Sequence, residues 1–158
     1  DIACRVAPDQ VTLVPENRKE VTTEGGLDVV RYKKELTETV RKLHDAGIAV
    51  SLFIDPEPAQ IETAASLLVP AVELHTGAYA NAKKDSQHEL QILAQAATFV
   101  HQAGLILNAG HGLTYRNVTP IAEIQGMDEL NIGHSIVARA VFVGMAEAVR
   151  EMRDLIPR

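Results

Sequence analysis

The chain alternates between short apolar runs and longer segments whose apolar residues recur at helical spacing. The runs predict buried strands beginning near positions 10, 48, 71, 105 and 129, each followed by a helix. Helices are expected over residues 29–46, 56–68, 86–103, 120–126 and 135–155. Connections of this size join parallel strands through right-handed crossovers. The pattern therefore predicts one α/β domain over residues 1–158.

Individual segments add detail to this pattern. Residues 48–54 are apolar on both faces apart from Ser51, which suits a parallel sheet covered by helices. Asp55 is expected to cap the helix that follows, with Pro56 and Glu57 in its first turn. The segment 135–155 predicts one long closing helix with an apolar side: Val137, Val141, Met145, Val149, Met152 and Ile156.

Two connections are polar. Residues 16–28 are long for a connection and include Thr22, so they form either an active-site loop or a plain surface loop. Residues 76–85 are expected to be a second loop. The sequence alone does not decide between the two readings of residues 16–28.

Glycine and histidine follow the last two predicted strands. Residues 105–107 lead into Gly110-His111-Gly112, and residues 130–132 lead into Gly133-His134. Glycine lets backbone N–H groups approach an anion, and the amino terminus of a following helix adds further donors. A dinucleotide-binding sheet would carry such a loop after its first strand, whereas barrels commonly bind phosphate after their last strands. The position favours a (β/α)8 TIM barrel, of which this chain would be a part.

The chemistry of the site would come from His111 and Glu73. Packing gives little reason for an imidazole between two glycines, so His111 is predicted to transfer protons, while Gly112, Gly133 and His134 form either a phosphate grip or ordinary turns. Glu73 shares a strand face with His75, and a carboxylate inside a barrel is costly unless it is paired or used. A structural ion pair is the alternative for Glu73. His75 is either a packed partner or a catalyst, and the helical His44, His88 and His101 are expected at the surface.

Composition and charge narrow the function classes. The chain is 46% hydrophobic and carries a net charge of −6, with no basic stripe, which argues against nucleic-acid and membrane partners. The lone Cys4 excludes an internal disulfide and a cysteine-rich zinc site, which fits a cytoplasmic location. Neither a metal-binding motif nor a serine-hydrolase motif is visible, and no apolar run has the length of a membrane span.

Several blocks of the sequence resemble one known family. These blocks are residues 11–16, 20–28, 50–55, 73–77, 108–115 and 129–134. Together they are similar to pyridoxine 5'-phosphate synthase, the PdxJ family, and the similarity runs through essentially the whole chain. The resemblance implies a cofactor-free barrel that joins 1-deoxy-D-xylulose 5-phosphate to 3-amino-2-oxopropyl phosphate. This reaction closes the pyridine ring of vitamin B6 with loss of phosphate and water.

The resemblance also implies roles for individual residues. His111 would be the proton donor, Glu73 would stabilise the transition state, and Thr22 would contact the deoxyxylulose phosphate. The aminooxopropyl phosphate would be held by Gly112, Gly133 and His134. The family implies a homo-octamer, for which residues 136–145 would either supply contacts or pack on the barrel.

The resemblance covers about the last five βα units of the family's barrel. No counterparts of its first three strands are found in residues 1–158, and those strands carry two of the family's proton acceptors. Five units alone would leave open sheet edges prone to pairing, so residues 1–158 by themselves are expected to have little or no synthase activity. The alternatives are another sugar-phosphate barrel enzyme, an isomerase or epimerase, or a non-catalytic phosphometabolite-binding fragment.

Overall fold

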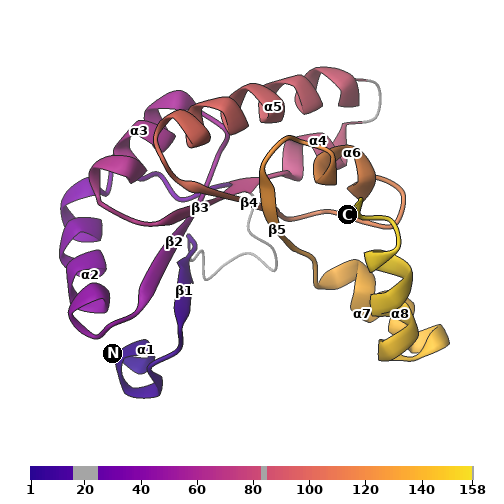
Figure 1. Cartoon of the computed structure of the whole chain (residues 1–158), viewed down its shortest axis with the longest axis horizontal. Coiled ribbons are helices and arrows are strands. Elements are labelled where there is room, and N and C mark those ends of the chain that lie inside the picture. Colours follow the sequence, from indigo (N-terminus) through magenta and orange to yellow (C-terminus); the bar gives the residue numbers. More distant parts are fainter. Residues whose placement is uncertain (16–24, 83–84, 158) are drawn as a thin grey trace.

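In a computed structural model, the chain forms a five-stranded parallel sheet with helices along one side (Figure 1). The structure describes residues 1–15, 25–82 and 85–157. The strands are β1 (Gln10–Leu13), β2 (Ala49–Ile54), β3 (Ala71–His75), β4 (Ile106–Gly110) and β5 (Met127–Asn131). They lie side by side in sequence order, and every neighbouring pair is parallel. This order confirms the predicted strand-helix units and is that of part of a (β/α)8 barrel.

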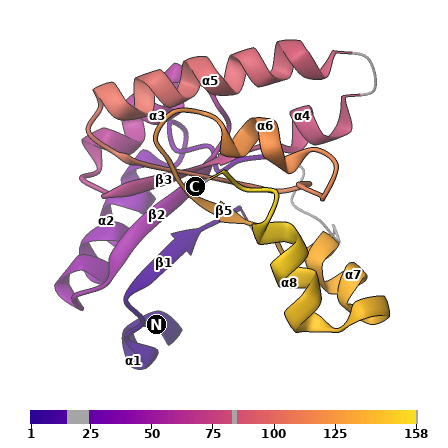
Figure 2. The same ribbon diagram turned by 45° about the vertical axis from the view of Figure 1, so that its right-hand side comes forward.

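Three of the helices in the described residues cover the outer face of the sheet. The full set of described helices is α1 (Ile2–Val6), α2 (Lys33–Asp45), α3 (Pro58–Ser66), α4 (Gly77–Asn81), α5 (Ser86–Gln102), α6 (Val118–Ala122), α7 (His134–Val143) and α8 (Met145–Arg153). Of these, α2, α3 and α5 lie along the sheet, while α7 and α8 extend beyond β5 (Figures 1 and 2). In the described part of the chain, none of them has the length and apolarity of a membrane-spanning helix.

The two faces of the sheet carry different side chains because successive strand residues point in opposite directions. Leu52, Leu74 and Leu107 belong to the apolar core beneath the helices. The other face carries Glu73 and His75, which confirms that these two share a face. Glu73 pairs in register with Phe53 on β2 and Asn108 on β4. Polar groups are thus gathered on the face that the helices leave uncovered.

Two helix predictions were wrong. Residues 76–85, expected to be a loop, contain the short helix α4. The expected single helix over residues 135–155 is two helices, because Gly144 has φ 83° and ψ 156°, a backbone region open essentially to glycine alone. The apolar side of this segment is mostly exposed, with Val137 55% and Val141 80% accessible, although Met152 is buried.

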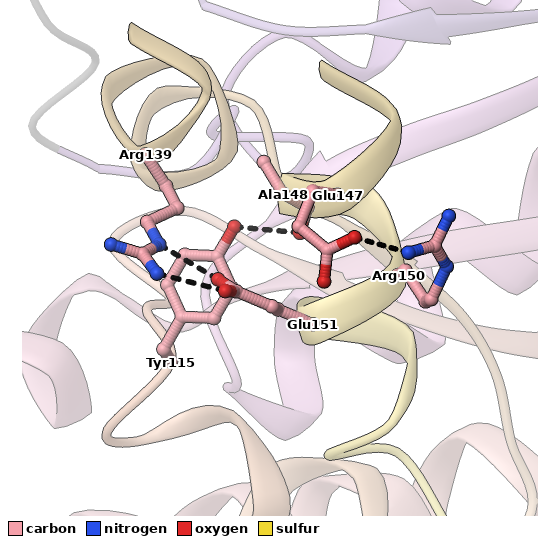
Figure 3. A network of polar contacts seen from close by, with 6 residues as sticks. All are labelled: Tyr115, Arg139, Glu147, Ala148, Arg150 and Glu151. Atoms are coloured by element: carbon pink, nitrogen blue, oxygen red, sulfur yellow. Dashed lines mark hydrogen bonds and ion pairs between the residues drawn. The ribbon is translucent and has the colours of Figure 1, made fainter. Parts of the chain in front are cut away.

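A polar network fixes α8 against its surroundings (Figure 3). Arg139 of α7 donates two hydrogen bonds to the Glu151 carboxylate of α8, at 2.7 and 2.8 Å. The Tyr115 hydroxyl, from the segment after β4, donates to the Ala148 carbonyl of α8 at 2.8 Å. The α7–α8 pair is therefore tied both to itself and to the loop that follows β4.

Candidate active site

A cavity of about 540 Å³ opens at the carboxyl ends of the strands. Parallel α/β enzymes bind their ligands at this end of the sheet. The lining residues are Val14, Phe53, Glu73, His111, Gly112, Leu113, Thr114, Asn131, Ile132, Gly133, His134 and Ser135. The loops after β4 and β5, which the sequence singled out, therefore line one cavity together with Glu73.

A larger hollow of about 790 Å³ lies on the helical side of the molecule. It is bordered by α5 and the segment from Pro120 to Gly126. None of the predicted site residues lines it, and it is away from the strand ends. The chemistry therefore points to the smaller cavity.

The loop after β5 offers amide donors to this cavity. Gly133 precedes α7, so the first amide groups of a ten-residue helix point toward the Gly133–His134 corner. A Cβ added at Gly133 would meet nothing within 4 Å, so the glycine leaves open space. The Ser135 hydroxyl donates to the Leu113 carbonyl at 2.8 Å and joins this loop to the one after β4. The first amides of a helix and the positive end of its dipole suit an anionic group.

Glu73 is a buried carboxyl group beside the cavity. Burial raises its pKa to about 7, and the negative charge of Glu129 acts in the same direction. The Asn131 side-chain amide donates to Glu73 Oε2 at 3.0 Å and opposes this rise. A Cβ at Gly110 would lie 2.2 Å from Glu73 Oε1, so glycine is needed there to make room for the carboxyl group. Glu73 can consequently hold or release a proton near neutral pH.

His111 lies directly after β4 with φ 83°, a conformation that residues other than glycine rarely adopt. The Thr76 hydroxyl lies within hydrogen-bond distance of the carbonyl oxygens of Gly110 and His111, at 2.7 and 2.5 Å. Burial lowers the pKa of His111, and the positive charge of a protonated His75 ring lowers it further. At neutral pH the His111 imidazole is therefore uncharged and able to accept a proton.

The sequence reasoning missed the part played by Asp55. Asp55 does not cap α3, which begins at Pro58 without a side-chain cap hydrogen bond. Its carboxylate instead accepts hydrogen bonds from the Gly26 amide and from His75 Nδ1, both at 2.9 Å. The Asp55 side chain therefore makes tertiary hydrogen bonds instead of the helix cap that the local sequence pattern predicted. The positions of the two residues could have predicted this contact, because Asp55 and His75 both lie at the carboxyl ends of adjacent parallel strands.

The remaining predicted residues fall into two groups. His44, His88 and His101 are exposed, as expected. Thr22 lies outside the residues that the structure describes.

Within the described ranges, no cluster of three or more His, Cys, Asp or Glu side chains is arranged to hold a metal ion.

Comparison with known proteins identifies the family. Residues 1–158 match the family model described as pyridoxal phosphate biosynthesis protein PdxJ. The chain belongs to this PdxJ family. It is 60% identical over 156 residues to the pyridoxine 5'-phosphate synthase of Rhodopirellula baltica, and 58% identical over 156 residues to that of Synechococcus sp. strain WH7803. Each alignment covers 98% of this chain and 63% of the relative, so the chain spans just under two thirds of their length.

A solved structure shows the same fold at low sequence identity. A xylose isomerase domain protein from Planctomyces limnophilus superposes with a TM-score of 0.57 and 13% identity, covering 99% of this chain and 64% of that protein. At this identity the likeness concerns the fold alone. It agrees with the assignment of the PdxJ chain to part of a (β/α)8 barrel.

Proposed function

We propose that this chain carries the phosphate site and proton-transfer groups of a pyridoxine 5'-phosphate synthase. The reaction would join 1-deoxy-D-xylulose 5-phosphate to 3-amino-2-oxopropyl phosphate without a cofactor. The observation that carries the proposal is one cavity bordered by Glu73, His111 and the amino terminus of α7, in a chain 60% identical to a synthase. A cytoplasmic location remains a prediction from the single cysteine, and a homo-oligomer remains a prediction from the family resemblance.

The proposed roles follow from the charge state of each group. A neutral His111 would first accept a proton from a reaction intermediate and then return it as the donor. Glu73, with its pKa about 7, would stabilise positive charge when ionised or donate a hydrogen bond when protonated. Gly112, Gly133 and His134 would hold the phosphate of 3-amino-2-oxopropyl phosphate. Thr22 would contact the other substrate.

The experiment uses a chimera, because the chain spans only 63% of its relatives. This chain replaces the matching part of the Rhodopirellula baltica synthase, and pyridoxine 5'-phosphate is measured by mass spectrometry after both substrates are added. We expect product from the chimera and a fall of about 100-fold or more with His111→Asn, since a proton-transfer group is lost. His88→Asn, a change on the exposed face of α5, serves as the matched control.

Other outcomes separate the competing functions. Conversion of a single sugar phosphate, without ring formation, would indicate an isomerase or epimerase instead. Binding of both substrates to a folded chimera with no product would favour a binding fragment. Near-normal rates in His111→Asn would remove His111 from the proposed mechanism.

A further inference from the structure

Two histidine rings meet beside the cavity. The rings of His75 and His111 lie with their centroids 5.0 Å apart at an interplanar angle of 60°, an edge-to-face arrangement. His75 is only 8% exposed, and its ring also packs on Phe53 at 5.2 Å. The position of the His111 ring is therefore limited on one side by His75.

Asp55 determines how His75 is oriented. The ionised carboxylate can only accept hydrogen bonds, so the 2.9 Å contact places the proton of His75 on Nδ1. The same oxygen, Oδ1, also accepts from the Gly26 amide. In the neutral ring His75 Nε2 then carries a lone pair, and it is buried without a hydrogen-bond partner among the residues that the structure describes. A buried acceptor left open is unusual unless it serves a purpose.

Gly77 keeps clear the space that both rings border. A Cβ at Gly77 would lie 2.5 Å from His75 Nε2 and 3.3 Å from His111 Cδ2. The open nitrogen of His75 and the edge of His111 thus face the same small volume. Any larger residue at position 77 would displace one ring or both.

We propose that His75 is a positioning residue for His111, and that Asp55 fixes the tautomer and orientation of His75 for this purpose. The importance of His75 for turnover rests on the proposed function, whereas its effect on the position and protonation of His111 does not. His75 would keep the His111 ring in place, and its own charge when protonated would oppose protonation of His111.

Other charged or titratable groups lie near this pair. Asp55 is hydrogen-bonded to His75, Glu73 and His134 line the same cavity as His111, and the charge of Glu129 acts on Glu73. Burial is the first cause of the lowered pKa of His111, and the charge that His75 carries when its ring is protonated is the second. Replacing His75 therefore removes one named cause and leaves the other groups in place.

The test is an NMR titration of the chain with isotope-labelled histidine, with His111→Asn used to assign the His111 signals. The variants are His75→Asn, Asp55→Asn, Asp55→Ala and, as control, the surface change His88→Asn. We expect the Nδ1–H tautomer of His75 in the unchanged chain and in Asp55→Asn, whose side-chain oxygen can still accept both hydrogen bonds. Asp55→Ala should lose this preference.

The same spectra report on His111. Its titration midpoint should rise in His75→Asn, because the charge of a protonated His75 ring is then absent, and stay unchanged in His88→Asn. If His75→Asn fails to fold, Gly77→Ala provides the second readout, because its methyl group should shift the signals of both rings. An Nε2–H tautomer of His75, or an unmoved His111 midpoint in folded His75→Asn, overturns the proposal. No substrate is used, so this failure is distinct from failure of the proposed synthase activity.

Discussion

Glu73 shows how burial changes the chemistry of a single residue. Its pKa rises from 4.5 to about 7 on folding, mainly through burial. Between these two pH values the folded chain binds a proton that the unfolded chain has released. The free energy of unfolding therefore falls as pH rises through this window, and the full destabilisation from ionised Glu73 is present above pH 7. A buried carboxyl group that destabilises the fold when ionised is more consistent with a role in a reaction than with a structural role.

This reasoning predicts a pH-dependent effect of Glu73→Gln. The variant should raise the free energy of unfolding by about 2 kcal/mol at pH 8, allowing for solvent screening, and by almost nothing at pH 4.5. Urea unfolding at both pH values measures the difference. Glu62→Gln, which removes an exposed carboxylate from α3, should show no comparable pH dependence. Equal gains at both pH values would argue against a raised pKa of Glu73.

Gly133 permits a clean test of the phosphate grip. A methyl group there meets no protein atom within 4 Å, so Gly133→Ala should change stability by less than about 1 kcal/mol. The methyl group would instead enter the space where a phosphate approaches the α7 amides. We expect the Kd for inorganic phosphate to rise about tenfold, as measured by calorimetry.

Gly47→Ala serves as the matched control for this change. Gly47 has φ 74° at the end of α2, so alanine should cost about 1 kcal/mol there while leaving phosphate affinity unchanged. Unaltered phosphate binding in Gly133→Ala would remove this corner from the proposed site.

At the scale of elements, hydrophobic periodicity located all five strands and the main helices. It also placed Glu73 and His75 on one face, because strand geometry leaves no other choice. It could not locate the break at Gly144, since a period of 3.6 continues across both α7 and α8. Nor could it assign Asp55, whose role depends on a contact 20 residues away in sequence. The hydrophobic pattern shows which residues are apolar. It does not predict the backbone angles or the tertiary contacts of a given residue.

The break between α7 and α8 depends on the backbone angles of one glycine. Gly144→Ala places a side chain where φ is 83° and ψ is 156°, which should destabilise the chain by about 2 kcal/mol. The strain would be relieved if α7 and α8 joined into one helix, at the expense of the Tyr115 contact to Ala148. Hydrogen exchange of the α8 amides should therefore accelerate. Slower exchange in α8, with no loss of stability, would contradict this account.

At the scale of the whole molecule, an apolar surface remains exposed on α7 and α8. We call it the α7–α8 patch: Val137, Val141, Phe142, Met145 and Val149, each at least 46% accessible. Large exposed apolar patches often mark a contact surface. The strands β1 and β5 also form the two edges of the sheet, each with one described neighbour. These features lie on surfaces where a further part of the fold or another subunit would pack.

We therefore expect the isolated chain to self-associate through the α7–α8 patch. Phe142→Lys introduces a charge at a side chain that is 83% exposed and should shift the mass toward the 17.1 kDa monomer in analytical ultracentrifugation. Leu68→Lys, an equally exposed apolar position after α3, is the matched control and should not alter association. The same mass for the unchanged chain and for Phe142→Lys would exclude the patch from self-association.

The order of the strands has a consequence for how the chain is made. Among the described residues, each strand pairs only with those that precede and follow it in sequence. A strand leaving the ribosome thus finds its earlier neighbour already synthesised, and β1 and β2 can pair before β3 exists. Growth of the sheet can follow translation step by step, and the cavity at the strand ends is completed only when the β5 loop and the start of α7 emerge.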